Sequence, residues 1–428
     1  MTMLLRRLIR RVRESLFTVP IAIIAGCVGA AAFTLWVDSR FGPAIEDWPI
    51  VLGTTVGGGR AIATTVAGAT ITVAAIVFSI TALSTQMASS QYSPRAMGGF
   101  FEDPLQQAII GLVVGTFTYS LLILGSMGHA IVDAEATPSV SVTFAVLLGV
   151  SSAIGIVAYI NHSLKRMQVD SVVRRIADAA MRAVDRHLDR AEPEEPPEGS
   201  PPHGEPRPVT AAESGWVVDI HPQLLIELLP PATTARVDVR IGEAVADGDR
   251  ILTLWPDPGE NRGLVEKVRR VVVTDYERSL ETDPTFGIRQ LVDIALRALS
   301  PGVNDPTTAV DVIHHLKTPI REVLMSSAPR RVYSGPGERR VFLTETPSRT
   351  EYVHLAFSEI RLAATGQPFV LRALIEVLGD LERELEGVGL SGRLAAVDQE
   401  LELTYQAARE SGLPKPDLQR VLGDLSED

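Results

Sequence analysis

Charged side chains are absent from four long stretches of this 428-residue chain, although Asp, Glu, Lys and Arg make up 21% of it. These apolar stretches cover residues 16–37, 61–87, 105–127 and 139–160. A helix of about 20 apolar residues crosses the bilayer core, so each stretch predicts a transmembrane helix. Proton pumps and ion-coupled transporters use ionisable groups at membrane depth, so their absence argues against both classes. The absence of charge does not exclude a channel, because hydroxyl or carbonyl groups can line a pore.

The chain also has a single cysteine and no excess of basic residues. Cys27 is the only cysteine and lies inside the first stretch, so the chain cannot form an intramolecular disulfide. This suits a soluble part in a reducing compartment. The formal net charge of −12 argues against nucleic-acid binding. No nucleophile motif, Walker loop or dinucleotide fingerprint is present, so we predict neither an enzyme nor a cofactor.

The residues that flank the stretches predict the orientation. The chain before the first stretch holds Arg6, Arg7, Arg10, Arg11 and Arg13. The chain after the fourth holds Lys165, Arg166, Arg174 and Arg175. The connection at 128–138 holds Asp133 and Glu135 and neither Lys nor Arg. By the positive-inside rule, and with a composition typical of a GC-rich bacterial genome, we expect an inner-membrane protein with both termini in the cytoplasm.

The second stretch has two different faces. Small or hydroxylated residues recur at steps of three and four, which places them on one side of a helix: Thr65, Gly68, Thr72, Ala75, Ser79, Ala82 and Gln86. We call this set the small-residue stripe. Two interpretations stay open. The stripe lines a pore between copies of the helix, or it packs tightly against another helix, as small residues commonly do in membranes.

Composition changes divide the chain into five parts. We expect a four-helix transmembrane domain at 1–160, an amphipathic connecting helix at 161–190, an acidic proline-rich linker at 191–208, a small β domain at 209–258 and a mainly helical domain at 259–428. The glycine pattern of the β domain resembles a barrel-sandwich fold of the lipoyl type. Residues 209–255 contain no lysine, so a carrier role is not expected.

The sharpest motif of the soluble part is a turn at residues 300–309. Asp305 is expected to cap a helix that begins at Pro306. The free N–H groups of that helix start form a candidate anion site with Ser300, Gly302, Asn304, Asp305, Thr307 and Thr308. The alternative is a corner whose polar groups cap one another. Asp311 and His315 have a spacing that suits a metal, but no third ligand is evident, so we predict no metal site.

Three segments carry a family resemblance: VFSITALSTQMASSQYSPR at 77–95, SGWVVDI at 214–220 and FGIRQLVDIALRALSPGVNDPTTA at 286–309. The whole chain resembles a bacterial family of predicted membrane proteins known as domain of unknown function 2254. The resemblance implies four N-terminal spans and a cytoplasmic C-terminal half. It implies no activity.

Together these features predict an α-helical membrane domain followed by a cytoplasmic α+β region. The leading hypothesis is a homo-oligomeric channel in which the second span lines the pore and the cytoplasmic part assembles and gates it. The alternative is a non-conducting, membrane-anchored scaffold or sensor that binds a ligand or protein through its cytoplasmic half, at residues 300–309. The expected partners are further copies of the chain, membrane lipid, and an ion or small anion.

Overall fold

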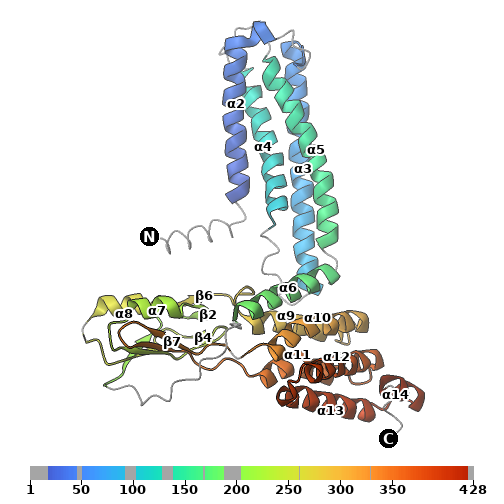
Figure 1. The fold of residues 1–428 in the computed structure, drawn as a ribbon. Helices are drawn as coiled ribbons and strands as arrows, with labels where there is room; N and C mark the ends of the chain where they lie inside the picture. Colours follow the sequence, from blue (N-terminus) through green and yellow to red (C-terminus); the bar gives the residue numbers. More distant parts are fainter. Residues whose placement is uncertain are drawn as a thin grey trace. The chain divides into compact units, whose positions relative to one another are not determined.

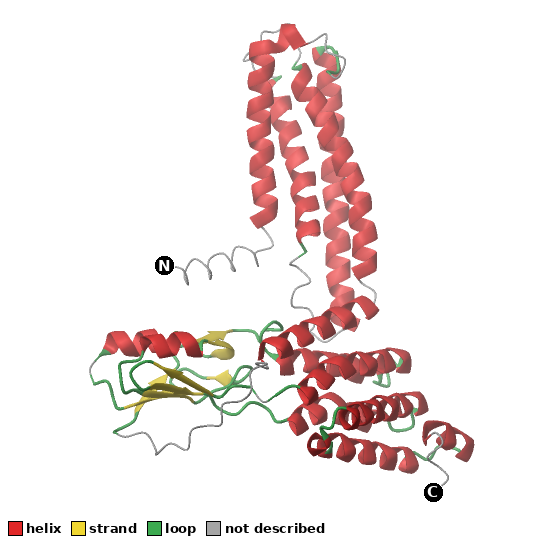
Figure 2. Cartoon of the chain, in the orientation of Figure 1, coloured by secondary structure: helices red, strands yellow, loops and turns green. Residues whose placement is uncertain are grey.

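The computed structural model describes residues 18–45, 51–91, 103–127, 138–166, 169–187, 204–259, 261–327 and 329–422. The chain divides into two compact units, Met1–Gln168 and Val169–Asp428. The first unit is helical, and the second combines helices with two sheets (Figures 1 and 2). The arginine-rich start, the connection at 128–137 and linker residues 191–203 lie outside the described residues.

Four long helices build the first unit. They are α2 (Thr18–Ile45), α3 (Val56–Gln91), α4 (Pro104–Ser126) and α5 (Ser139–Arg166). Each is long and apolar enough to cross a membrane, as the sequence predicts. α3 has 36 residues. At 1.5 Å per residue it is about 54 Å long, well beyond the apolar core of a bilayer.

Two glycines bring α4 close to α2. Gly111 and Gly115 stand four residues apart on one side of α4. A methyl group at Gly115 would lie 2.7 Å from Sγ of Cys27, and one at Gly111 would lie 2.9 Å from Cα of Pro20. These contacts leave no room for a side chain, so the glycines permit a tight helix pair of the small-xxx-small kind.

Polar groups inside the first unit satisfy one another. Asp38, at the end of the first span, accepts hydrogen bonds from the backbone N–H of Val140 and of Ser141, both at 2.9 Å. These donors belong to the first turn of α5, where no carbonyl of the helix itself can reach them. Tyr119 shares a hydrogen bond of 2.8 Å with Thr34 and donates to the carbonyl of Ser141. Spans one, three and four are therefore joined at one end.

Two sheets occupy one part of the second unit. Their strands are β1 (Arg207–Thr210), β2 (Gly215–Ile220), β3 (Thr234–Val237), β4 (Ala244–Val245), β5 (Arg250–Trp255), β6 (Val272–Asp275), β7 (Val332–Gly335) and β8 (Arg339–Phe342). The orders are β1-β5-β3-β8-β7 and β4-β2-β6. All pairs are antiparallel except β3 with β8.

A shared apolar core holds the sheets together. Short helices α7 (Pro222–Leu228) and α8 (Arg262–Arg269) pack on it. The fully buried core side chains include Leu225, Ala235, Val237, Leu252, Leu254 and Val341. Val341 comes from β8, so the core is complete only with residues far beyond the first strands.

The described β region therefore differs from the contiguous domain expected at 209–258. The chain turns at residues 335–337 and forms the β7–β8 hairpin, and strand β8 pairs with β3 and places this hairpin in the β region. The sheets are open, and the described residues form no closed barrel, so the barrel-sandwich expectation is unconfirmed. Sequence periodicity shows that strands exist and cannot show which distant strands pair.

Helices fill the rest of the second unit. They are α6 (Val169–His187), α9 (Pro284–Ala298), α10 (Pro306–Met325), α11 (Arg349–Ala363), α12 (Pro368–Gly387), α13 (Ala395–Glu410) and α14 (Lys415–Leu422), with a short 3-10 helix at Ser391–Arg393. α6 packs on α9 and α10, so the helix expected to connect the two parts of the chain belongs to the helical part of the second unit. A methyl group at Gly287 of α9 would lie 2.6 Å from Cβ of Ala180, which fixes how closely α6 approaches.

Candidate functional site

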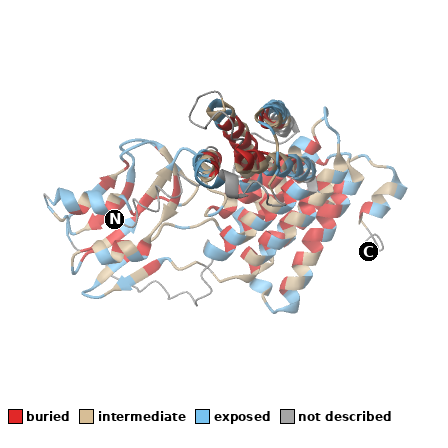
Figure 3. Cartoon of the chain, turned by 90° about the horizontal axis from the view of Figure 1, so that it is seen from above, coloured by how far each residue is buried: buried red, intermediate tan, exposed pale blue. Residues whose placement is uncertain are grey.

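The small-residue stripe lies on the outside of the four-helix unit. All seven of its members are exposed. The side of α3 that packs on α4 and α5 consists of other small residues, namely Ala63, Ala67, Thr70, Ala74 and Val77. Figure 3 shows the same division, with exposed residues on the outer sides of the helices of this unit. The stripe is therefore not used for packing within one chain.

The hydroxyl groups of the stripe bond to their own helix. Thr65 donates to the carbonyl of Ala61 at 2.8 Å, and Thr72 donates to that of Gly68 at 2.9 Å. Ser79 donates to the carbonyl of Ala75 at 2.8 Å. Each hydroxyl thus uses its proton inside the helix and keeps oxygen lone pairs as acceptors on the outside.

Large apolar side chains border the stripe on both sides. At 100° per residue, Ile71 and Phe78 fall along one edge, and Ile76 and Leu83 fall along the other. Their exposed fractions range from 46% for Ile71 to 57% for Leu83. The outward face of α3 is therefore a narrow band of small and hydroxylated residues between two apolar shoulders.

The turn at residues 300–309 is a self-bonded corner. Asp305 accepts hydrogen bonds from the N–H of Thr308 at 3.1 Å and from its hydroxyl at 2.6 Å. Asn304 has a positive φ of 48° and accepts a hydrogen bond from Gln367. Ser300 donates to the carbonyl of Arg297. The structure brings the six candidate residues together, with the carboxylate of Asp305 at the helix start, and an anion there stays a prediction.

His315 and Asp311 lie next to each other, with Nε2 and Oδ1 3.8 Å apart. Among the described residues, no group of three or more His, Cys, Asp or Glu side chains has a geometry for a metal.

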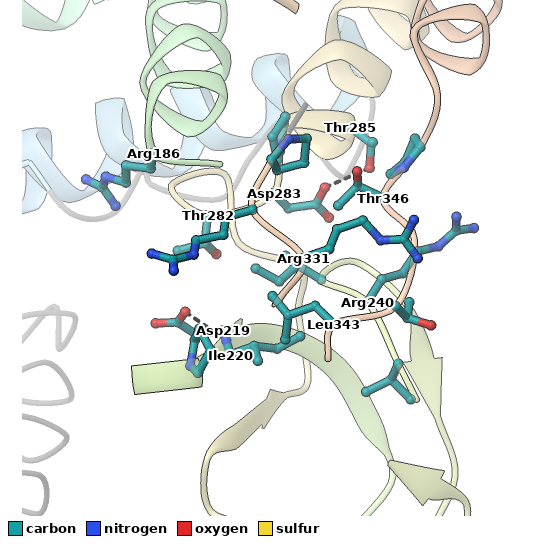
Figure 4. Close-up of a pocket in the computed structure, with 18 of the residues that line it drawn as sticks. Arg186, Asp219, Ile220, Arg240, Thr282, Asp283, Thr285, Arg331, Leu343 and Thr346 are labelled. Atoms are coloured by element: carbon teal, nitrogen blue, oxygen red, sulfur yellow. Dashed lines mark hydrogen bonds between the residues drawn. The ribbon is translucent and has the colours of Figure 1, made fainter. Parts of the chain in front are cut away.

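A cavity of about 460 Å³ lies between the β region and the helices of the second unit. Its walls come from α6, β2, the start of α7, the connection after β3, the start of α9, the β7–β8 hairpin with both its flanks, and α11. Four arginines line it: Arg186, Arg240, Arg330 and Arg331. Asp219 and Asp283 are its carboxylates. In the view of Figure 4, Arg186 and Asp219 lie on one side, and Arg240 and Arg331 on the other.

The carboxylate of Asp283 is already engaged. It is 1% exposed and caps α9 by accepting from the N–H of Phe286 at 3.2 Å. It also accepts from Arg278 at 2.6 Å and from the hydroxyl of Thr285 at 2.7 Å. Asp283 therefore holds the cavity wall together and does not neutralise the four lining arginines.

The sequence predicts one element of the cavity wall and does not predict its lining arginines. The pair Asp283-Pro284 predicts the helix start at its wall. The arginines come from three separate places in the sequence, Arg186, Arg240 and the neighbours Arg330 and Arg331, so only the folded chain brings all four together.

The chain is similar to known proteins over most of its length. A family model described as Predicted membrane protein (DUF2254) matches residues 13–380. An uncharacterized protein of Mycobacterium bovis and its counterparts in two strains of Mycobacterium tuberculosis are 29% identical to this chain over 418 residues. The alignment covers 96% of this chain and 79% of each relative. No solved structure gives a significant match.

Proposed function

This chain belongs to the DUF2254 family of predicted membrane proteins, and we propose that it forms a homo-oligomeric channel in the bacterial inner membrane with α3 lining the pore. The orientation proposed from the flanking charges places both termini, and with them the second unit, in the cytoplasm. There the second unit would assemble and gate the channel.

The observation that carries this proposal is the outward position of the small-residue stripe. The chain already packs α3 through a different set of small residues, centred on Ala67 and Ala74. Tight packing within one chain therefore does not account for the stripe. A ring of copies gives it a partner, because the shoulders at Phe78 and Leu83 would contact neighbouring copies while the stripe turns toward the axis.

The chemistry of the stripe suits a pore for small cations. Thr65, Thr72 and Ser79 would present rings of oxygen acceptors, each able to replace part of the hydration of a passing ion. None of the seven stripe residues is charged. Transport driven by proton transfer within the stripe is therefore not part of the proposal.

Planar-bilayer recording of the purified protein tests conduction. Ser79→Phe should reduce the single-channel current, because a ring would narrow the pore at that level. It should leave the melting temperature near the wild-type value, because Ser79 is exposed within one chain. Val157, which is 68% exposed on α5, supplies the matched control. Val157→Phe adds the same ring to an outer surface and should leave the current unchanged.

Cysteine cross-linking tests the assembly separately. In a Cys27→Ala background, Thr72→Cys and Ser79→Cys should form disulfide-linked dimers in membranes, and Val157→Cys should not. Cross-linking that fails along the whole stripe, together with a protein that is silent under voltage and membrane tension, would contradict the channel.

The cavity in the second unit supports a second function. A non-conducting, membrane-anchored sensor would need a ligand site in its soluble part, and the arginine-lined cavity has the size of such a site. A protein that binds a ligand there and passes no current would be this sensor.

A further inference from the structure

We propose that the arginine-lined cavity binds a soluble phosphorylated small molecule, with Arg240 and Tyr352 as its main contacts. This inference goes beyond the proposed channel and does not depend on conduction, because binding can be measured without any current.

The cavity wall carries an excess of positive charge. Four guanidinium groups face two carboxylates, in a chain whose net charge is −12. Asp283 is bonded to Arg278 and to the start of α9. Asp219 accepts from the N–H of Ile220 at 2.8 Å and lies 3.6 Å from His221. Neither carboxylate pairs with a lining arginine in the described structure. Arg330 donates its Nε–H to the carbonyl of Val332 at 3.0 Å, so an anion would depend on the guanidinium groups of the other three arginines.

The guanidinium of Arg240 has fewer partners in the described structure than those of the other three arginines. The backbone N–H of Arg240 donates to Glu243 at 3.1 Å, but its guanidinium forms no hydrogen bond or ion pair with any residue that the structure describes. Arg331 pairs with Glu345 at 3.0 Å, and Arg186 lies 3.8 Å from Glu281, but Glu345 and Glu281 are largely exposed. Exposed pairs of this kind contribute little to stability, so a bound anion can replace them at small cost.

The hydroxyl of Tyr352 is a second, uncharged donor in the cavity. It is 4% exposed, yet its hydroxyl bonds to no group in the described part of the chain. The same side chain lines the main cavity and two adjoining ones of about 300 and 190 Å³. Burial raises its pKa, so the hydroxyl keeps its proton. A ligand oxygen in the cavity would give this hydroxyl a hydrogen-bond partner from within the site.

Size and lining narrow the class of ligand. Pockets for small organic ligands span about 300 to 1,000 Å³, and this cavity lies within that range. Guanidinium groups on different walls favour a ligand with several anionic oxygens, and the fork of arginine matches phosphate. Ile220, Val239 and Leu343 add apolar surface for an organic body. A nucleoside monophosphate combines these properties.

Isothermal titration calorimetry of the full-length protein in detergent tests the site with two probes, adenosine 5′-monophosphate and inorganic pyrophosphate. At least one should bind with a Kd below the millimolar range, while adenosine and chloride at matched ionic strength should not. Arg240→Gln should weaken binding by about tenfold or more, the loss of one charge-assisted contact. Tyr352→Phe should weaken it less, since only a hydroxyl is removed.

The matched control is Arg372→Gln on α12. Arg372 pairs with Glu376 on the surface and lines none of the three cavities, so the variant should bind the probes as the wild type does. The guanidinium of Arg240 forms no hydrogen bond or ion pair in the described fold, and the variant keeps the backbone bond to Glu243, so its thermal melting should match that of the wild type. The proposal is overturned if neither probe binds, or if Arg240→Gln binds as tightly as Arg372→Gln.

Discussion

Asp38 and Ser141 join the end of the first span to the beginning of the fourth. Oδ2 of Asp38 accepts from the backbone N–H of Ser141 at 2.9 Å and from its hydroxyl at 2.6 Å. One carboxylate thus acts as the cap of a helix that begins about a hundred residues later. Caps are usually local in sequence, whereas this one holds α2 against the start of α5.

Loss of this cap should destabilise the first unit. Asp38→Ala leaves the N–H groups of Val140 and Ser141 without their acceptor, and we expect a cost of about 1–3 kcal/mol. Thermal unfolding of the detergent-purified protein should show a lower midpoint. Ser39→Ala is the control, because Ser39 is exposed and its hydroxyl donates to the carbonyl of Trp36 in its own helix. An equal loss in both variants would show that the cap is unimportant.

The glycine contact between α4 and α2 predicts a compensating pair. Gly115→Ala would place a methyl group against Sγ of Cys27 and should cost about 1–3 kcal/mol through overpacking. Cys27→Ala removes that sulfur, so the double variant should recover part of the lost stability. The measurement is a double-mutant cycle of unfolding midpoints. Gly125→Ala, where a methyl group meets nothing within 4 Å, should be silent.

Glu400 is a buried charge that depends on its partners. It is fully buried and bonds to Arg361 at 2.8 Å, to Ser358 at 2.7 Å and to His354 at 3.1 Å. Glu400→Ala leaves the guanidinium of Arg361 without its carboxylate partner, so we expect the free energy of unfolding to fall by about 3–5 kcal/mol.

The exposed pair of Glu376 with Arg372 provides the comparison. Glu376→Ala should cost about 1 kcal/mol or less, because solvent screens this pair. Chemical denaturation of both variants measures the difference. Similar losses would mean that the buried network contributes no more than a surface contact.

Acid should destabilise the second unit through Glu351. The backbone N–H of Ser348 donates to this carboxylate at 2.6 Å and lowers its pKa below the ordinary value of 4.5. A lowered folded-state pKa contributes stability above the unfolded pKa, and this is lost as pH falls through the folded value. Glu351→Gln keeps a capping amide and removes the titration. Its melting temperature should fall less than that of the wild type as pH drops below 4.5. Parallel pH curves would contradict the assignment.

Much of this fold follows from local sequence rules. The absence of charge marks the four spans, and an Asp-Pro pair marks the starts of α4, α9 and α10. Local rules work here because a span and a capped helix start each depend on neighbouring residues. Register between distant strands, such as β3 and β8, depends on the packing of the whole unit and leaves no periodic signal.

The small-residue stripe of α3 and the arginine-lined cavity also differ in how far the sequence predicts them. The sequence shows the stripe of α3 but not its direction, since Ala63, Ala67 and Ala74 form another small face on the same helix. Only the packing of α3 on α4 and α5 shows which face the chain uses internally. The arginine-lined cavity has no sequence signature, because its arginines come from three separate segments of the chain.

The pairing of β3 with β8 has a consequence during synthesis. When β3 leaves the ribosome, the strand that will cover its outer edge is still about a hundred codons away, beyond α9 and α10. Until β8 emerges, the nascent chain carries an open strand edge and an apolar core without Val341. Such an edge can pair wrongly with other chains. Folding of the β region is therefore tied to translation of the hairpin, and truncation before residue 339 should give aggregates.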